Sequence, residues 1–305
     1  MDLLKRMSRV LDYIEENLTN DIDYETVARI AHCSSFNFQR IFSFITDVSL
    51  AEYVRRRRLT QAALELRDGG VGVVDLAVKY GYESSAAFSR AFQNLHGVKP
   101  SSARKGGVAL KAYPRITFQI TIQGERPMDY RIESKPAFDI FGIETVYTAI
   151  GDENYDISVR HWQRCVQDGK IGGLEKSAGP FPGFMGPDEA RPYNYCLVNG
   201  ASYPRGTRND AFQFMLFCFK GPDDTPPEYT QVHIPAATYA MFTLGPVKWE
   251  ENYGEIRKLR KRIFTEWFPV SDYELADMAD FEIFGGTKTG EDFAHIELWY
   301  PLRKR

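Results

Sequence analysis

The chain has 305 residues, of which 43% are hydrophobic and 26% charged, and its formal net charge is −3. This composition excludes collagen-like, wholly coiled-coil and broadly disordered chains, and the length predicts two domains. The longest nearly apolar run, residues 211–219, is far shorter than the about 20 residues that a membrane helix requires. The first residues lack the basic start and apolar stretch of a signal peptide, so we expect a cytoplasmic protein.

The cysteines and histidines show no pattern typical of a metal site or a redox motif. The four cysteines are widely spaced without a Cys-x-x-Cys, and no two of the five histidines have metal-ligand spacing. The sequence also contains no Gly-rich phosphate loop and no Gly-x-Ser-x-Gly. We therefore expect no metal, no cofactor and no familiar cofactor-dependent enzyme.

A nine-residue motif occurs twice in the first hundred residues. Residues 34–42 and residues 84–92 both read Ser-Ser-x-x-Phe-x-Arg-x-Phe, and each copy follows a short stretch with apolar residues at helical spacing. Ser34 and Ser84 stand where an N-cap is expected. The repeat predicts one supersecondary unit used twice, each a helix, a tight turn and a second helix.

The second helix of each unit has an apolar face and a polar face. The Phe pairs 38/42 and 88/92 are four residues apart and should pack inward. Polar side chains on the other face of a turn-linked helix suit the reading of base edges in the major groove of DNA. The candidate DNA-contacting residues are Ser35, Phe36, Gln39, Arg40 and Ser43 in the first unit, and Ser85, Ala86, Ser89 and Arg90 in the second.

A longer helix is predicted between the two units. Residues 49–52 (Ser-Leu-Ala-Glu) form a capping-box pattern, and Asp68-Gly69-Gly70 marks the end. Such a helix would hold two reading helices about 30 Å apart, close to the spacing of successive major grooves. Four consecutive arginines, 55–58, cannot all face one duplex. We expect at least two of them on a solvated face and one or two, Arg55 first, to contact phosphate.

Residues 1–107 resemble the DNA-binding domain of AraC/XylS transcription regulators. The matching pieces are the two repeated motifs, residues 48–54, residues 77–84 and Gly97-Val98-Lys99-Pro100-Ser101. The resemblance implies two helix-turn-helix units whose third and sixth helices read double-stranded DNA as a monomer. Asp47 departs from the usual Gly and would need a positive φ, and Ala86 and Ala87 replace longer polar residues. The alternative is a helical bundle that binds another protein.

The pattern changes after a linker at residues 105–107. Residues 108–127 are expected to continue the linker and to hold a first strand, because Ile116, Phe118, Ile120 and Ile122 alternate. Residues 130–143 and 232–244 then share one pattern of short strand, Pro-Ala turn and long strand, each followed by an amphipathic helix. We predict an α+β domain over 128–305, an antiparallel sheet built from two similar halves that meet at a cleft.

Glu297 is the most informative residue of this second domain. Alternation along residues 293–300 places Glu297 on one face with Phe293, His295 and Trp299. A carboxylate among rings requires a partner, and a lipophilic cation could provide one. Two alternatives stay open: a solvated Glu on a half-exposed strand, or an Arg or Lys partner within the domain.

Residues 128–305 resemble the GyrI-like effector-binding domain, the type built from two SHS2 repeats. The matching pieces are residues 130–143, 266–274, 281–284 and 296–302. The resemblance implies a cleft that binds amphipathic cations, with Glu297 at its base. By the same resemblance, the lining candidates are Trp162, Tyr195, Trp267, Tyr147 and Trp299.

Three functions follow for the whole chain. The first is a ligand-responsive transcription regulator, with operator DNA, a small cationic effector and RNA polymerase as partners. The second is a GyrI-like hydrolase with Glu297 as general base and Tyr195 or Tyr239 as acid, which the fused DNA-binding domain disfavours. The third is a C-terminal domain that binds only another protein, for which a cleft closed by side chains would be typical.

Overall fold

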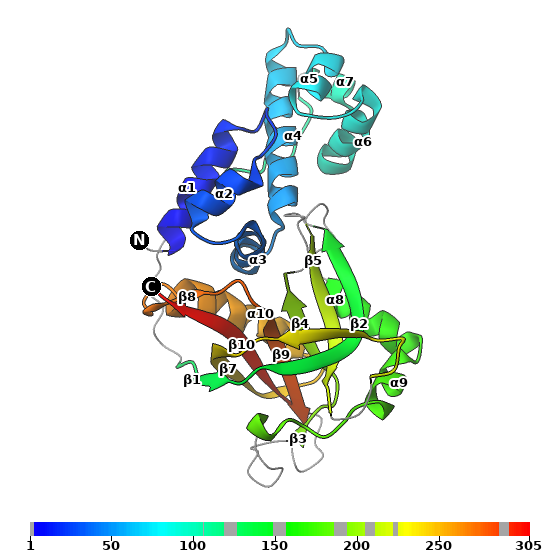
Figure 1. Ribbon diagram of the computed structural model, residues 1–305. Helices are drawn as coiled ribbons and strands as arrows, with labels where there is room; N and C mark the ends of the chain where they lie inside the picture. Colours follow the sequence, from blue (N-terminus) through cyan, green and yellow to red (C-terminus); the bar gives the residue numbers. More distant parts are fainter. Residues whose placement is uncertain are drawn as a thin grey trace.

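The computed structural model describes residues 3–105, 107–118, 127–148, 157–185, 194–204, 211–221, 225–286 and 293–305. Figure 1 shows a helical region joined to a sheet domain. The helices of the first region are α1 (Leu3–Glu16), α2 (Tyr24–Ala31), α3 (Ser35–Thr46), α4 (Leu50–Asp68), α5 (Val73–Lys79), α6 (Ser85–His96) and α7 (Pro100–Ala103).

The two predicted helix-turn-helix units are present as α2–α3 and α5–α6, with α4 between them. Their caps are those expected from the sequence: the hydroxyl of Ser34 accepts a hydrogen bond from the Asn37 amide at 3.2 Å, and that of Ser84 from the Ala87 amide at 3.1 Å. Asp47 ends α3 with a φ of 59°, the left-handed conformation that was predicted for it. Helix α4 has 19 residues and ends at Gly69, which also has a positive φ.

The two units do not share one core. The second unit packs on the C-terminal half of α4 around the buried rings of Phe88 and Phe92. The first unit packs around Phe38 and Phe42, and its hydrophobic core continues into the sheet domain through Phe264 and Tyr300. Figure 1 shows the consequence: α5, α6 and α7 lie at the far end of α4, whereas α3 lies against the sheet domain.

The second domain is an antiparallel sheet, as predicted. Its strands, in the part of the chain that the structure describes, are β1 (Tyr130–Lys135), β2 (Phe138–Thr148), β3 (Asn194–Tyr195), β4 (Asn199–Tyr203), β5 (Ala211–Phe219), β6 (Thr230–Ile234), β7 (Ala237–Lys248), β8 (Tyr273–Leu275), β9 (Asp280–Gly286) and β10 (Phe293–Lys304). The order along the sheet is β1-β7-β10-β9-β4-β5-β2-β6, with β3 paired to β9 and β8 to β10.

The strand order is that of two related halves. Strand β1 pairs with β7, and β6 pairs with β2, so the first strand of each half adds to the long strand of the other. The halves join where β4 pairs with β9. The repeated pattern in the sequence therefore marks a pseudo-twofold arrangement, and each Pro-Ala turn sends the chain to the opposite end of the sheet.

Helices cover one face of this sheet (Figure 1). They are α8 (Ile157–Gln167) and α9 (Lys170–Lys176) in the first half, and α10 (Asn252–Arg262) with the π-helical segment η4 (Ile263–Trp267) in the second. A short 3-10 turn, η2 (Gly183–Met185), lies on the other face, where Met185 joins the core. Residues 107–118 form no strand, so the prediction of a strand that begins near Ile116 is wrong for these residues. The rest of that predicted strand, residues 119–126, lies outside the described residues.

Candidate DNA interface and effector site

Helix α6 presents its predicted reading residues to solvent. Ser85, Ala86 and Arg90 are exposed and Ser89 is half-buried, whereas the apolar face packs inward. The cap at Ser84 fixes the start of α6, and the C-cap at Gly97 ends the helix with a φ of 79°. This geometry is that of a helix free to enter a major groove.

Helix α3 is buried along the same face, which corrects the expectation that both helices are displayed. Ser35, Phe36, Gln39 and Arg40 are each at most 7% exposed, and Ser43 is half-buried with its hydroxyl bonded to the carbonyl of Gln39. The cause is the second domain, which packs on this face. In this arrangement none of the four buried side chains can reach DNA.

The contacts that cover α3 are polar and specific. The guanidinium of Arg40 donates two hydrogen bonds to the carboxylate of Asp280, one of them at 2.8 Å. Asp277 accepts from the Ser34 hydroxyl and from the Asn37 side-chain amide, the latter at 2.6 Å. Burial would lower the pKa of Arg40, but the charge of Asp280 outweighs it and raises that pKa, so the guanidinium stays charged.

The four consecutive arginines of α4 all have partners within the chain. Arg55 and Arg56 both donate to the carboxylate of Glu52, one turn away. Arg57 is buried against Glu15, and Arg58 donates to the backbone carbonyls of residues 18 and 20. Arg55 and Arg56 stay half-exposed, at 34% and 31%, so both could also meet phosphate. The contact of Arg55 with DNA stays a prediction.

Glu297 is buried on β10 and is neutralised by the protein itself. Both its carboxylate oxygens lie 3.0 Å from the guanidinium of Arg131 on β1, and the Trp299 indole donates to it at 2.7 Å. The pKa of Arg131 would be lowered by burial, but the Glu297 charge raises it. The alternative of an internal Arg partner therefore describes this state, in place of an open carboxylate awaiting a cation.

A second internal cation lies on the same face of the sheet. Lys135 is buried, and its ammonium lies 5.2 Å from the ring of Trp299 and 5.5 Å from that of Phe184. It also bonds to Glu133 at 2.7 Å. Arg131 and Lys135 thus occupy the positions that a lipophilic cation was expected to fill.

The predicted lining residues of the cleft lie on two opposite faces of the sheet. Glu297 and Trp299 belong to the face that carries no α-helix, where Tyr195 packs on Phe181. Trp267 packs on the helix-covered face beside Phe242, within the core. Trp162 also lies on the helix side, and the Tyr147 side chain lies outside the described residues. The prediction that all these residues line a single pocket is therefore wrong.

A cavity of about 410 Å³ does lie where the two halves meet, on the helix-covered face between α8 and α10. Its volume is typical of small-molecule sites. Its lining comprises Ser158, Val159, Trp162, Gln163, Glu175, Cys196, Val198, Phe214, Trp249, Asn252, Tyr253, Ile256, Arg260, Glu282 and Phe284. Five of these residues are aromatic, and Glu175 on α9 is exposed to solvent.

Two of the charged lining residues form a buried pair. Arg260 donates to Glu282, and their side chains are 11% and 13% exposed. Glu282 was not among the residues predicted from the sequence, although alternation along β9 would have placed it on one face with Phe284. Arg260 carried no such signal, because its position on α10 alone does not indicate what it faces.

Family comparisons agree with this two-part organisation. A model described as a helix-turn-helix domain matches residues 27–106, and one described as an integron-associated effector binding protein matches residues 131–302. The chain belongs to this effector-binding family, and its helical region is an AraC-type DNA-binding domain. It is therefore a transcription regulator with a GyrI-like effector-binding domain.

Individual relatives and solved structures match parts of the chain, and the curated relatives match the helical region. The transcriptional activator AarP of Providencia stuartii is 37% identical over 98 residues, which are 32% of this chain and 73% of AarP. The multiple antibiotic resistance protein MarA of Escherichia coli is 35% identical over 95 residues, 31% of this chain and 75% of MarA. The solved structure of SAV2435 bound to tetraphenylphosphonium covers 58% of this chain and 94% of its own, at 16% identity and a TM-score of 0.42.

Among the residues that the structure describes, no helix has the length and apolar character needed to cross a membrane. Within the same residues, no cluster of three or more His, Cys, Asp or Glu side chains could hold a metal ion.

Proposed function

We propose that a small amphipathic cation binds in the cavity between α8 and α10 and controls DNA binding by the helical region. The observation that carries this proposal is the cavity itself, which is of ligand size, lined by five aromatic rings and bordered by the exposed carboxylate of Glu175. Its second carboxylate, Glu282, is paired with Arg260. Rings attract cations through their faces, and a nearby carboxylate adds charge complementarity.

The face of the sheet around Glu297 has less support as the effector site. A cation entering there would have to displace Arg131 or Lys135, which already neutralise and fill it. The hydrolase alternative meets the same obstacle, since Glu297 is engaged by Arg131. The Tyr239 hydroxyl is fully buried, and burial raises the pKa of this group. An open cavity also favours a small molecule over a domain that binds only protein.

DNA contact by α6 is the second part of the proposal. Ser85, Ala86, Ser89 and Arg90 would read base edges from this helix, while Arg55 would contact phosphate. Arg90 is the residue with the reach and charge to pair with guanine. Contact with RNA polymerase stays a prediction.

The test uses isothermal titration of the full chain with tetraphenylphosphonium and with the neutral triphenylphosphine oxide. We expect the cation to bind more tightly than the neutral compound. Trp162→Ala should weaken cation binding by about tenfold, because it removes one wall of the cavity and a ring–cation contact of about 1–2 kcal/mol. Glu297→Gln should leave it nearly unchanged. The reverse pattern, with loss at Glu297 and none at Trp162, would move the site to the opposite face.

A further inference from the structure

The same motif has opposite surroundings in the two helix-turn-helix units. Arg40 of α3 is buried against the second domain, whereas Arg90 of α6, at the equivalent position, is exposed. Both helices have the same cap and the same inward Phe pair. The burial of α3 is therefore caused by what packs on it and is no property of the unit.

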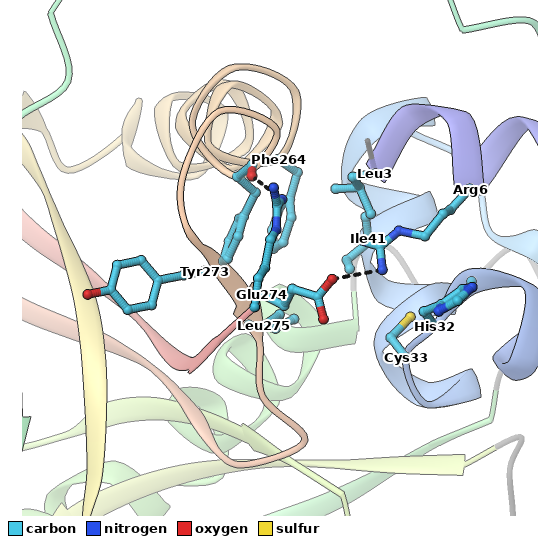
Figure 2. A pocket seen from close by; sticks show the side chains of 12 residues that line it. Leu3, Arg6, His32, Cys33, Ile41, Phe264, Tyr273, Glu274 and Leu275 are labelled. Carbon is cyan, nitrogen blue, oxygen red and sulfur yellow. Dashed lines mark hydrogen bonds and ion pairs between the residues drawn. The ribbon is translucent and has the colours of Figure 1, made fainter. Parts of the chain in front are cut away.

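The covering domain presents three carboxylates to the helical region, on and around β8 and the start of β9, which we name the acidic edge: Glu274, Asp277 and Asp280. Asp277 and Asp280 bond to Ser34, Asn37 and Arg40 of the first unit. Glu274 pairs with Arg6 of α1 at 2.9 Å. Figure 2 shows Arg6 and Glu274 facing each other across the boundary between α1 and β8.

This boundary is closely packed. The cavity drawn in Figure 2 is only about 30 Å³, lined by Leu3 and Ile41 from the helical region and by Phe264 and Leu275 from the second domain. That volume admits about one or two water molecules and no effector. The contact is thus a continuous apolar core with a polar, acidic margin.

The acidic edge offers α3 the chemistry that DNA would offer. A carboxylate binds a guanidinium through two parallel hydrogen bonds, as the O6 and N7 atoms of guanine and the oxygens of a phosphate do. Asp280 binds Arg40 in this bidentate way. We propose that the acidic edge is an internal competitor of DNA, and that the structure is a closed state in which α3 cannot enter a major groove.

A second contact holds the other end of α3. The carboxylate of Asp47 accepts from Arg257 at 3.0 Å and lies 3.5 Å from the ammonium of Lys261, both on α10. Phe44 stacks on Phe264, with ring centroids 5.7 Å apart. The whole length of α3, from Ser34 to Asp47, is therefore engaged by the second domain.

The cavity and the closed state share one residue, and this step rests on the proposed function. Arg260 lines the cavity beside Glu282, and its guanidinium lies 4.9 Å from the ring of Phe44 on α3. Arg40 contacts the same ring at 5.3 Å. A cation that binds Glu282 competes with Arg260 for that carboxylate. Ligand binding would then loosen the α3 contact, because the ligand favours the arrangement in which Arg260 has moved.

The experiment measures DNA binding of the full chain by fluorescence anisotropy. The probe is a duplex selected from a randomised pool with the Asp277→Asn, Asp280→Asn double variant. This variant should bind the duplex at least about tenfold more tightly than the unaltered chain, because closure lowers the fraction of competent molecules. The matched control is Asp168→Asn with Glu228→Gln, which makes the same change of net charge at exposed residues away from α3. The control should bind as the unaltered chain does.

A second variant keeps the test decisive if the first does not fold, as judged by circular dichroism. Arg257→Gln with Lys261→Gln removes the α10 contact at half-exposed and exposed side chains. Loss of two positive charges ordinarily weakens DNA binding. The closed state predicts the opposite sign, a severalfold tighter complex at constant salt.

The outcomes separate the two ideas. Equal affinities for the unaltered chain and the double Asp variant, or weaker binding by the α10 variant, would overturn the closed state. A selection from which no duplex emerges, with all variants folded, would overturn DNA reading and hence the proposed function. Addition of tetraphenylphosphonium should tighten DNA binding by the unaltered chain and leave the double Asp variant unchanged. If the cation binds the unaltered chain but leaves its affinity for DNA unchanged, the coupling through Arg260 is overturned.

Discussion

Arg40 and Arg90 occupy equivalent positions in two copies of one motif, yet Arg40 is bound by Asp280 and Arg90 faces solvent. The difference depends on a contact between residues that are 240 positions apart in the chain. Buried ion pairs add little net stability, because desolvation offsets their attraction. The Arg40–Asp280 pair is thus better understood as a specific contact that orients the domains.

The first prediction concerns Arg90. Arg90→Ala should reduce discrimination between a selected duplex and its scrambled version by about 1–3 kcal/mol, because a bidentate base contact is lost. Stability should change by less than about 0.5 kcal/mol, since the side chain is exposed. Anisotropy with both duplexes checks this, with Arg164→Ala on α8 as the control. Equal loss on both duplexes would assign Arg90 to phosphate.

The second prediction concerns Glu297. Glu297→Gln should lower the free energy of unfolding by about 1–2 kcal/mol, because it weakens the hydrogen bonds from Arg131 and Trp299 to a buried acceptor. Urea unfolding followed by tryptophan fluorescence measures the change. Glu228→Gln, at an exposed site, should have no such effect. Unchanged stability of the Glu297 variant would show that the carboxylate is not needed for folding and is free for another role.

A third prediction separates charge from shape in the cavity. Glu175→Gln should weaken the binding of tetraphenylphosphonium by only severalfold, because the Coulomb attraction of a solvent-exposed carboxylate is modest. Binding of triphenylphosphine oxide should stay the same. Titration at two salt concentrations provides an internal check, since the effect should shrink at high salt. Similar losses for both compounds would mean that Glu175 shapes the cavity and does not attract charge.

The fourth prediction is a pH dependence at the domain boundary. Burial would raise the pKa of Glu274, but hydrogen bonds and charges from Arg303 and Arg6 outweigh it, so this pKa lies below its ordinary value. The associated stability is present above the ordinary Glu pKa of about 4.3 and is lost as the pH falls through the lower, folded value. The stability difference between the unaltered chain and Glu274→Gln should therefore be constant near neutral pH and vanish in acid. Thermal unfolding across this range measures it, and a difference that grows in acid would contradict the assigned pairing.

Local signals in the sequence were sufficient for most of the elements and for the two repeats, although the strand expected from Ile116 is absent from residues 107–118. The Ser34 and Ser84 caps, the Gly69 end of α4 and the Pro-Ala turns each depend on a few neighbouring residues, and the structure confirms them. The alternation of β10 placed Glu297 and Trp299 on one face, which their hydrogen bond confirms.

Long-range partners could not be predicted in the same way. The partner of Glu297 is Arg131, 166 positions away, and it reaches the carboxylate only because β1 crosses to the half that contains β7 and β10. The same holds for Arg260, whose contact with Phe44 depends on how the two domains pack. Sequence patterns were enough to predict which faces are apolar. Which polar residues are covered depends instead on how the two domains pack.

Because the halves of the sheet exchange their first strands, each half depends on the other to complete its edge. Because β1 completes the edge beside β7, and β6 completes the edge beside β2, either half alone would lack its outermost hydrogen-bonded neighbour. A cut in the connection between β5 and β6 should therefore give two pieces that are insoluble apart and assemble when mixed.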